Sequence, residues 1–287
     1  MAQYPELHGK VAIVTGAGRR GGLGAAIAQR LAAEGAKVVL ADLPTEVPTD
    51  QPADQPVDLQ QDAAPRTELQ AVVADIAAAG GQALALTCDM LDGAAVERLV
   101  ADTVRVWGGV DILVNNAGVG NVMKPIVDMS LDEWDTVLGV NLRGVFAATQ
   151  AVARHFISQG RGGRIVNIAS QAAKSGFPHA AAYCASKHGL VGLTRVAAIE
   201  LAAHRVTVNA VCPNHVTTGL GAWQNAYFAQ LLGKSVDDYL ADMRARIPLG
   251  RAGLPSDTAN AVAFLCSEQA QYITGEAMNV SGGEEVH

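Results

Sequence analysis

The sequence predicts an α/β fold in which one parallel sheet is wound with helices on both faces. Three observations predict it. Short apolar runs alternate with helical stretches, the first run ends in a glycine-rich turn that opens a helix, and hydrophobic residues make up 49% of the 287 residues. Strands that alternate with helices are typical of parallel sheets, because parallel strands need crossover connections. The length suits one large domain over 1–287 better than two small ones.

The first strand is expected at Val11–Thr15, an apolar run that glycines end. Helical apolar spacing follows over Leu23–Glu34, and Gly35 is placed to cap that helix. The remaining strands are expected at Lys37–Asp42, Ala83–Thr87, Ile112–Asn115, Arg164–Ile168, Val206–Val211 and Ala277–Val280. The helices between them are expected at Thr67–Ala79, Ala94–Val106, Leu131–Ser158, Ala181–Ala203 and Ser256–Leu265.

Composition excludes several functional classes. The net charge is −7 with no basic block, which argues against nucleic acid and anionic membranes as partners. No apolar run is long enough to span a bilayer, and the N-terminal residues do not resemble a secretion signal. The four cysteines lie far apart, and the histidines lack ligand-like spacing, so neither a disulfide framework nor a metal site is expected. A cytoplasmic protein follows as the default.

The turn between the first strand and the first helix reads Thr15-Gly-Ala-Gly-Arg-Arg-Gly-Gly-Leu-Gly24. Glycines in such a turn let the backbone approach a pyrophosphate, which then lies at the helix N-terminus. A glycine motif alone is weak evidence, but this one follows a strand and opens a helix. It predicts dinucleotide binding through Gly16, Gly18, Gly22, Leu23 and Gly24.

Asp42 ends the second strand, where a carboxylate can accept hydrogen bonds from the adenosine ribose hydroxyls. A 2′-phosphate would meet a like charge there, so Asp42 favours NAD over NADP. The adjacent Leu43 is also expected to contact the cofactor. Arg19 and Arg20 are the counter-evidence, since an arginine in the turn can reach such a phosphate, although both also suit a solvated loop.

The stretch 43–66 is rich in proline and acidic residues and is expected to be an irregular insertion. One interpretation is a tolerated surface loop. The other is a flap over the cofactor's adenosine, because the stretch leaves directly from the ribose-binding position.

Ser170, Tyr183 and Lys187 lie in one stretch, with tyrosine and lysine four residues apart. On a helix that spacing places both side chains on one face. The lysine ammonium is then expected to lower the pKa of the phenol, so that the tyrosine can exchange protons near neutral pH. This chemistry suits the oxidation of an alcohol or the reduction of a ketone beside a hydride carrier.

The chain resembles the short-chain dehydrogenase/reductase family from about Gly9 to Gly283. The motifs that carry the resemblance occur in the family's order: Asn115-Asn-Ala-Gly118, Asn141 in Val-Asn-Leu-Arg, Ser170 with Tyr183 and Lys187, Pro213-Asn-His-Val-Thr-Thr218, and Val280-Ser-Gly-Gly283. Two departures stand out. The glycine turn holds two extra residues, and Asn214 replaces the family's usual glycine, although asparagine tolerates left-handed backbone angles. The resemblance implies a Rossmann-type sheet.

The resemblance also implies residue roles. Tyr183 would take the hydroxyl proton, Ser170 would stabilise charge on the same oxygen, Lys187 would hold the nicotinamide ribose, and Asn141 would position a water that links Lys187 to solvent. Cofactor contacts are further implied for Asp89, Met90, Asn116, Ala117, Gly118, Pro213, Val216 and Thr218.

Selectivity is expected from the segment 219–247, which in the family folds over the substrate. It holds Trp223 and polar neighbours, and Gln171, Asn214 and His215 flank the catalytic region. Many hydrogen-bonding groups suit a polyhydroxylated substrate, because donors left unpaired by an apolar ligand are costly.

The leading hypothesis is an NAD-dependent dehydrogenase of a polyol, sugar or vicinal diol. The alternatives are an NADPH-dependent 3-oxoacyl-thioester reductase and a nicotinamide-binding regulatory protein without turnover. Asp42 and the acidic insertion argue against the first alternative, and the presence of Tyr183 and Lys187 argues against the second. Relatives commonly pair through the helices at Leu131–Ser158 and Ala181–Ala203, so a homotetramer or dimer is expected.

Overall fold

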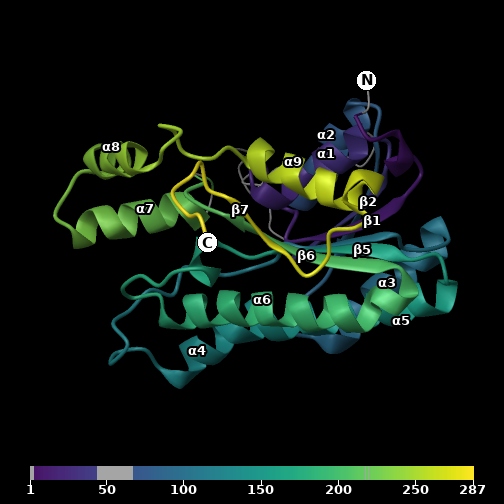
Figure 1. The fold of residues 1–287 in the computed structure, drawn as a ribbon, viewed down its shortest axis with the longest axis horizontal. Helices are drawn as coiled ribbons and strands as arrows, with labels where there is room; N and C mark the ends of the chain where they lie inside the picture. Colours follow the sequence, from purple (N-terminus) through teal and green to yellow (C-terminus); the bar gives the residue numbers. More distant parts are fainter. Residues whose placement is uncertain (1–2, 44–66, 217, 219) are drawn as a thin grey trace, which may run out of the picture.

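A computed structural model describes residues 3–43, 67–216, 218 and 220–287 (Figure 1). Its sheet has seven strands in the order β3-β2-β1-β4-β5-β6-β7, and every neighbouring pair is parallel. The strands are β1 (Val11–Thr15), β2 (Lys37–Asp42), β3 (Gln82–Thr87), β4 (Ile112–Asn115), β5 (Gly163–Ile168), β6 (Val206–Pro213) and β7 (Ala277–Val280). The predicted α/β fold with a doubly wound parallel sheet is confirmed, and each expected strand lies within two residues of its observed bounds.

Helices cover both faces of the sheet (Figure 1). One layer contains α1 (Leu23–Ala33), α2 (Glu68–Ala78) and α9 (Pro255–Cys266), and the other contains α3 (Gly93–Trp107), α5 (Val145–Gln159) and α6 (Ala181–Leu201). Strand residues alternate between the two cores: Ala12 and Val14 pack with the first layer, whereas Ile13 packs with the second. Both faces of the strands are therefore apolar, as expected for a sheet buried between two layers.

The predicted helix over Leu131–Ser158 is not one regular helix. The chain forms α4 (Leu131–Leu138), then the π-helical stretch η2 (Gly139–Gly144), and then α5. Apolar spacing continues through all three pieces, so periodicity alone could not show the break. Asn141 lies inside the π-helical stretch, a feature often found at functional sites.

The direction of winding reverses between β1 and β4, because β1 pairs with β2 on one side and with β4 on the other. The loops that leave the carboxyl ends of these strands diverge there and open a crevice, the usual ligand site of such sheets. Beyond β6, α7 (Leu220–Leu231) and α8 (Val236–Arg246) project from the body at this end (Figure 1). Apart from Leu43, the proline-rich stretch 43–66 lies outside the described residues. Among the helices that are described, none combines the length and apolarity needed to cross a membrane.

Candidate active site

A cavity of about 680 Å³ opens along the carboxyl ends of the strands. It collects residues from the glycine turn, β2, the loops after β3 and β4, the start of α6 and the segment after β6. Most of the predicted site residues line it: Gly16, Gly22, Leu23, Gly24, Asp42, Leu43, Asp89, Met90, Asn116, Ala117, Gly118, Ser170, Gln171, Tyr183, Lys187, Pro213, Asn214, His215, Val216 and Thr218. Gly18, Asn141 and Trp223 do not line the cavity.

The glycine turn is packed too closely to hold side chains at two of these positions. Gly16 has a φ of +65°, and a β-carbon there would lie 2.6 Å from Ala117 Cα. A β-carbon at Gly24 would lie 2.3 Å from the Gly16 carbonyl oxygen and 2.6 Å from Asn116 Nδ2. The turn therefore needs glycine both for its backbone angles and for its contact with the loop after β4.

Two residues lock the glycine turn to the loop after β4. The Asn116 side-chain amide donates to the carbonyl oxygens of Thr15 and Gly16 at 3.0 and 2.8 Å. The Thr15 hydroxyl, which is fully buried, accepts from the backbone N–H groups of Asn116 and Ala117, both at 3.1 Å. Asn116 thus holds in place two of the loops that line the cavity. Thr15 has the same role and was overlooked in the sequence interpretation.

The start of α1 suits a pyrophosphate. Gly22 occupies its N-cap position, and no side chain of the described residues caps this end, whereas Thr67, Asp92 and Ser130 cap α2, α3 and α4. The first N–H groups of a helix have no partner within the helix, and they attract anions. Gly22, Leu23 and Gly24 all line the cavity, so these amides face the space where a dinucleotide would lie.

Asp42 lies at the other end of this turn. Its carboxylate accepts from the backbone N–H of Gly18 at 2.8 Å and from that of Leu43 at 2.8 Å. Gly18 therefore holds the carboxylate from outside the cavity. A carboxylate has about four acceptor positions, so two hydrogen bonds leave Asp42 able to accept from ribose hydroxyls.

The two arginines of the turn have different surroundings. Arg20 forms a bidentate ion pair with Asp75 on α2, with N–O distances of 3.0 and 2.7 Å. Arg19 lines the cavity. Of the two residues that could meet a 2′-phosphate, only Arg19 is placed beside the cofactor space.

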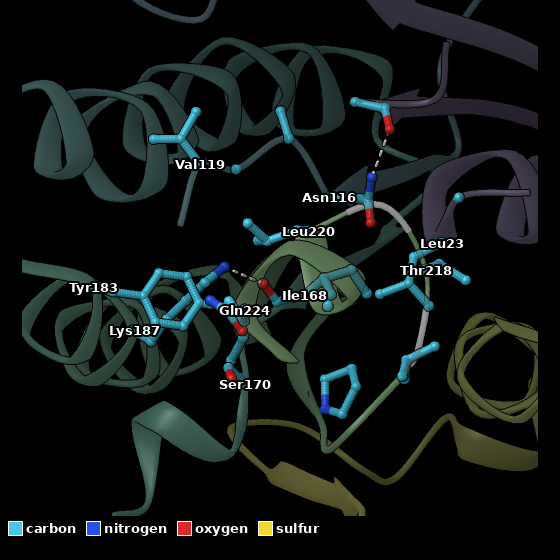
Figure 2. Close-up of a pocket in the computed structure, with 18 of the residues that line it drawn as sticks. Leu23, Asn116, Val119, Ile168, Ser170, Tyr183, Lys187, Thr218, Leu220 and Gln224 are labelled. Carbon is cyan, nitrogen blue, oxygen red and sulfur yellow. Dashed lines mark hydrogen bonds between the residues drawn. The ribbon is translucent and has the colours of Figure 1, made fainter. Parts of the chain in front are cut away.

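Ser170, Tyr183 and Lys187 converge at the opposite end of the cavity (Figure 2). Tyr183 and Lys187 lie one turn apart on α6 and are both buried, and Ser170 follows β5 at the start of a short 3₁₀ turn. Lys187 Nζ donates to the Ile168 carbonyl oxygen at 2.8 Å and lies 5.7 Å from the centre of the Tyr183 ring.

Burial dominates the proton affinities of this group. It raises the pKa of Tyr183, while a hydrogen bond from Ser170 acts in the lowering direction. It lowers the pKa of Lys187 to about 8. The prediction that Lys187 brings the pKa of the phenol near neutral pH stays a prediction; in the protein alone, burial shifts the pKa of Tyr183 upward.

Asn141 is fully buried behind the residues that line the cavity. Its side chain accepts from Val119 N–H and donates to the Val119 carbonyl, both at 2.8 Å, and donates to Ser186 Oγ at 3.1 Å. The π-helical stretch turns this side chain toward the loop after β4. The predicted water relay through Asn141 stays a prediction.

The predicted substrate residues separate into two groups. Gln171, Asn214 and His215 line the cavity, and Glu284 near the C-terminus binds the last two, at 2.7 Å from Asn214 Nδ2 and 3.1 Å from His215 Nε2. Burial lowers the pKa of His215 despite the carboxylate. Trp223 is not among the residues that line the cavity and stacks on Tyr227, with ring centres 5.5 Å apart, so its role toward the substrate stays a prediction.

Apolar side chains of the segment after β6 line the cavity in its place: Leu220, Phe228, Leu231, Leu232 and Tyr239. The sequence interpretation did not single out these residues as ligands of the substrate. Aromatic and leucine residues at helical spacing have the same pattern as packing residues, so only the position of α7 and α8 separates the two roles.

Comparisons with known proteins agree with this geometry. A family model described as enoyl-(acyl carrier protein) reductase matches residues 59–285. A short-chain dehydrogenase/reductase of Armillaria gallica is 36% identical over 283 residues, which cover 99% of this chain and 98% of the relative.

Two solved structures extend the likeness to the whole fold. A variant of actinorhodin polyketide ketoreductase with NADPH aligns with a TM-score of 0.85 and 35% identity, covering 100% of both chains. NAD⁺-bound xylitol dehydrogenase aligns with a TM-score of 0.84 and 32% identity, covering 97% of this chain and 100% of the other. The two neighbours carry different nicotinamide cofactors.

Proposed function

The chain belongs to the short-chain dehydrogenase/reductase family, whose members are NAD(P)-dependent oxidoreductases of alcohol and ketone groups, and on that premise we propose that it oxidises a secondary alcohol with NAD. The observation that carries the proposal is the convergence of Ser170, Tyr183 and Lys187 on one cavity that also contains Asp42. The proposed substrate is a polyol, a sugar or a vicinal diol.

The chemistry divides between proton and hydride. When bound, the nicotinamide supplies the acceptor for the hydride that leaves the carbinol carbon. Tyr183 takes the hydroxyl proton as the ketone forms, and Ser170 donates a hydrogen bond to the same oxygen, where charge develops. Lys187, held by the Ile168 carbonyl, keeps a cation next to the phenol. In the reverse direction Tyr183 returns the proton to the alkoxide oxygen.

Asp42 supports NAD as the cofactor. Its carboxylate is fixed by the N–H groups of Gly18 and Leu43, so it cannot turn away from a 2′-phosphate without losing both hydrogen bonds. Arg20 is bound to Asp75 and does not offset this charge. A 2′-phosphate beside this carboxylate would meet a like charge, which disfavours NADP.

The test measures reduction of NAD⁺ and NADP⁺ at 340 nm with secondary alcohols, vicinal diols, sugar alcohols and 3-hydroxyacyl thioesters. The proposal expects NAD⁺ to be used at least tenfold more efficiently, with a diol or polyol as substrate. Tyr183→Phe should abolish turnover while NADH still binds, as followed by NADH fluorescence. Normal turnover by this variant contradicts the assignment of Tyr183.

A second candidate is the NADPH-dependent reduction of a 3-oxoacyl thioester. Arg19 favours it, because this side chain lines the cavity on the side of Asp42 and can meet a 2′-phosphate. Turnover restricted to NADPH and a thioester substrate would select this candidate over the first.

We also propose a cytoplasmic homo-oligomer, a dimer or tetramer. The helices expected to pair expose large apolar side chains. These are Phe146 on α5 and Val196 and Ile199 on α6. Surfaces of this kind commonly mark protein interfaces. Sedimentation of the purified protein at micromolar concentration tests the proposal, and a monomer contradicts it.

A further inference from the structure

The polar groups around the catalytic end of the cavity are mostly engaged by the protein itself. Glu284 binds the side chains of both Asn214 and His215. Gln224 Nε2 donates to the Gly120 carbonyl at 3.1 Å, and Ser175 Oγ donates to Glu285 Oε2 at 3.1 Å. These donors therefore do not need a substrate hydroxyl to be satisfied, which weakens the argument for a substrate that is hydroxylated along its whole length.

Two polar side chains at this end retain capacity. The Ser170 hydroxyl accepts from the Ala172 N–H at 3.1 Å and also faces Tyr183, and the Gln171 side chain forms no hydrogen bond with the described residues. The two residues are adjacent in the chain after β5, so one can hydrogen-bond the reacting hydroxyl of a substrate and the other can hydrogen-bond an oxygen on the neighbouring carbon. A pair of adjacent oxygens is what a vicinal diol or its hydroxyketone presents.

An apolar wall begins directly beside the catalytic tyrosine. A β-carbon added at Gly120 would lie 2.9 Å from Tyr183 Cε2 and 3.0 Å from Leu220 Cδ2, so the two side chains flank the same spot. In the view of Figure 2, Leu220 lies between Tyr183 on one side and Leu23 on the other. Phe228 continues the wall and meets Phe177 edge to face, with ring centres 5.8 Å apart.

The wall ends in two leucines at the connection of α7 and α8. Leu231 is 48% exposed and Leu232 is 58% exposed, yet both line the cavity. Tyr239 on α8 lines the same part and is buried. Apolar area that stays in contact with water inside a binding cavity gains free energy when a ligand covers it.

We infer that the substrate is a vicinal diol, or the corresponding hydroxyketone, that carries an apolar substituent of several carbons. The diol oxygens meet Ser170, Tyr183 and Gln171, and the substituent lies along Leu220, Phe228 and Leu231. This inference rests on the proposed alcohol dehydrogenase function and narrows its substrate. A sugar alcohol fits poorly, because its distal hydroxyls would lie against leucine side chains and lose hydrogen bonds to water.

The test compares 1,2-propanediol, 1,2-butanediol, 1,2-hexanediol and 1,2-octanediol with xylitol under saturating NAD⁺. The inference expects kcat/KM to rise along the diol series by up to about fourfold per methylene, and xylitol to be at least tenfold poorer than hexanediol. Leu231→Gln combined with Leu232→Gln should remove most of the rise. Both positions are half exposed, so the variant is expected to fold.

The matched control is Ile157→Gln, which alters an exposed apolar residue (45%) in the last turn of α5, outside the cavity. It should preserve the dependence on chain length. A second readout is independent of turnover: calorimetry of Tyr183→Phe with NAD⁺ should give tighter binding of octanediol than of propanediol.

The outcomes separate the two proposals. If kcat/KM stays constant or falls along the diol series and xylitol is oxidised as efficiently as hexanediol, the inference of an apolar substituent is overturned. The proposed alcohol dehydrogenase function then still holds. Absence of NAD⁺ reduction with every diol and polyol overturns the proposed function and, with it, this inference. A rise that persists unchanged in the double leucine variant also overturns the inference, because the leucines would not be what binds the substituent.

Discussion

Lys187 Nζ donates its hydrogen bond to the Ile168 carbonyl oxygen at 2.8 Å, and Ile168 is the last residue of β5. The buried cation is therefore anchored to the edge of the sheet, while the phenol of Tyr183 lies one helical turn away on the same helix. This geometry fixes the spacing between β5 and α6 at the catalytic end of the cavity. It also places an ammonium group where water cannot fully solvate it.

Burial of Lys187 should appear in the pH dependence of stability. Burial lowers the pKa of the Lys187 ammonium from its ordinary value of 10.5 to about 8 in the folded protein. Between these values the unfolded chain holds a proton that the folded protein has lost, so the free energy of unfolding rises with pH through this window. Relative to Lys187→Met, the wild-type value should gain on the order of 3 kcal/mol from pH 8 to 10.5.

Urea unfolding followed by circular dichroism measures this difference. Tyr183→Phe serves as the control, because it should retain the rise. Parallel curves for wild type and Lys187→Met would show that the ammonium is solvated in the folded protein.

Ser170→Ala should lower kcat by about 10²–10³-fold, the usual effect of removing one donor to a developing oxyanion. Its hydrogen bond also lowers the pKa of Tyr183. Without it, the pKa of the phenol rises, and the pH at which alcohol oxidation reaches half its maximum shifts upward. Rate profiles from pH 6 to 11 test the shift. Ser175→Ala, which loses a contact to Glu285 instead, should leave the midpoint unchanged.

Replacing Arg19 and replacing Arg20 should have different effects on the preference for NAD⁺ over NADP⁺. Arg20→Ala removes an exposed ion pair with Asp75, so it should leave the ratio of NAD⁺ to NADP⁺ efficiency unchanged and cost at most about 1 kcal/mol of stability. Arg19→Ala should lower any residual use of NADP⁺ several-fold. Asp42→Ala should reduce the preference for NAD⁺ by at least about tenfold, near 1.4 kcal/mol. Initial rates with NAD⁺ and NADP⁺ measure these ratios for each variant. A large change in the ratio for Arg20→Ala would contradict the position of Arg20 away from the cofactor.

Gly24→Ala should abolish cofactor binding, because the new methyl group would collide with the Gly16 carbonyl and the Asn116 amide. We expect a loss of stability of about 1–3 kcal/mol from the forced backbone shift. The control is Gly93→Ala at the start of α3, where a β-carbon meets nothing within 4 Å. Thermal unfolding and NADH fluorescence measure both variants. Retained NADH affinity in Gly24→Ala would show that the turn is not the pyrophosphate site.

The fold could be predicted from sequence because its determinants are local. Each strand is a short apolar run, and glycines mark the ends of the first strand and helix. The catalytic group was also readable, since Ser170, Tyr183 and Lys187 lie within 18 residues of one another and the helical repeat brings two of them together. Side chains that meet through the sheet, such as Thr15 with the loop after β4, leave no local pattern.

The parts that failed depend on tertiary position. Trp223 was expected at the substrate; the structure stacks it on Tyr227, whereas Phe228 and Leu231 of the same helix line the cavity. The π-helical stretch at Asn141 keeps the apolar spacing of a regular helix. The upward shift of the Tyr183 pKa comes first from burial among neighbouring side chains, and the spacing of Tyr183 and Lys187 in the sequence does not show that burial.

The last few residues of the chain are tied to the substrate end of the cavity. Glu284 binds Asn214 and His215, and Glu285 binds Ser175 and the imidazole of His287. In this protein any change that displaces Glu284 and Glu285 would also move Asn214, His215 and Ser175, so an alteration of this segment can change the choice of substrate without touching the catalytic residues.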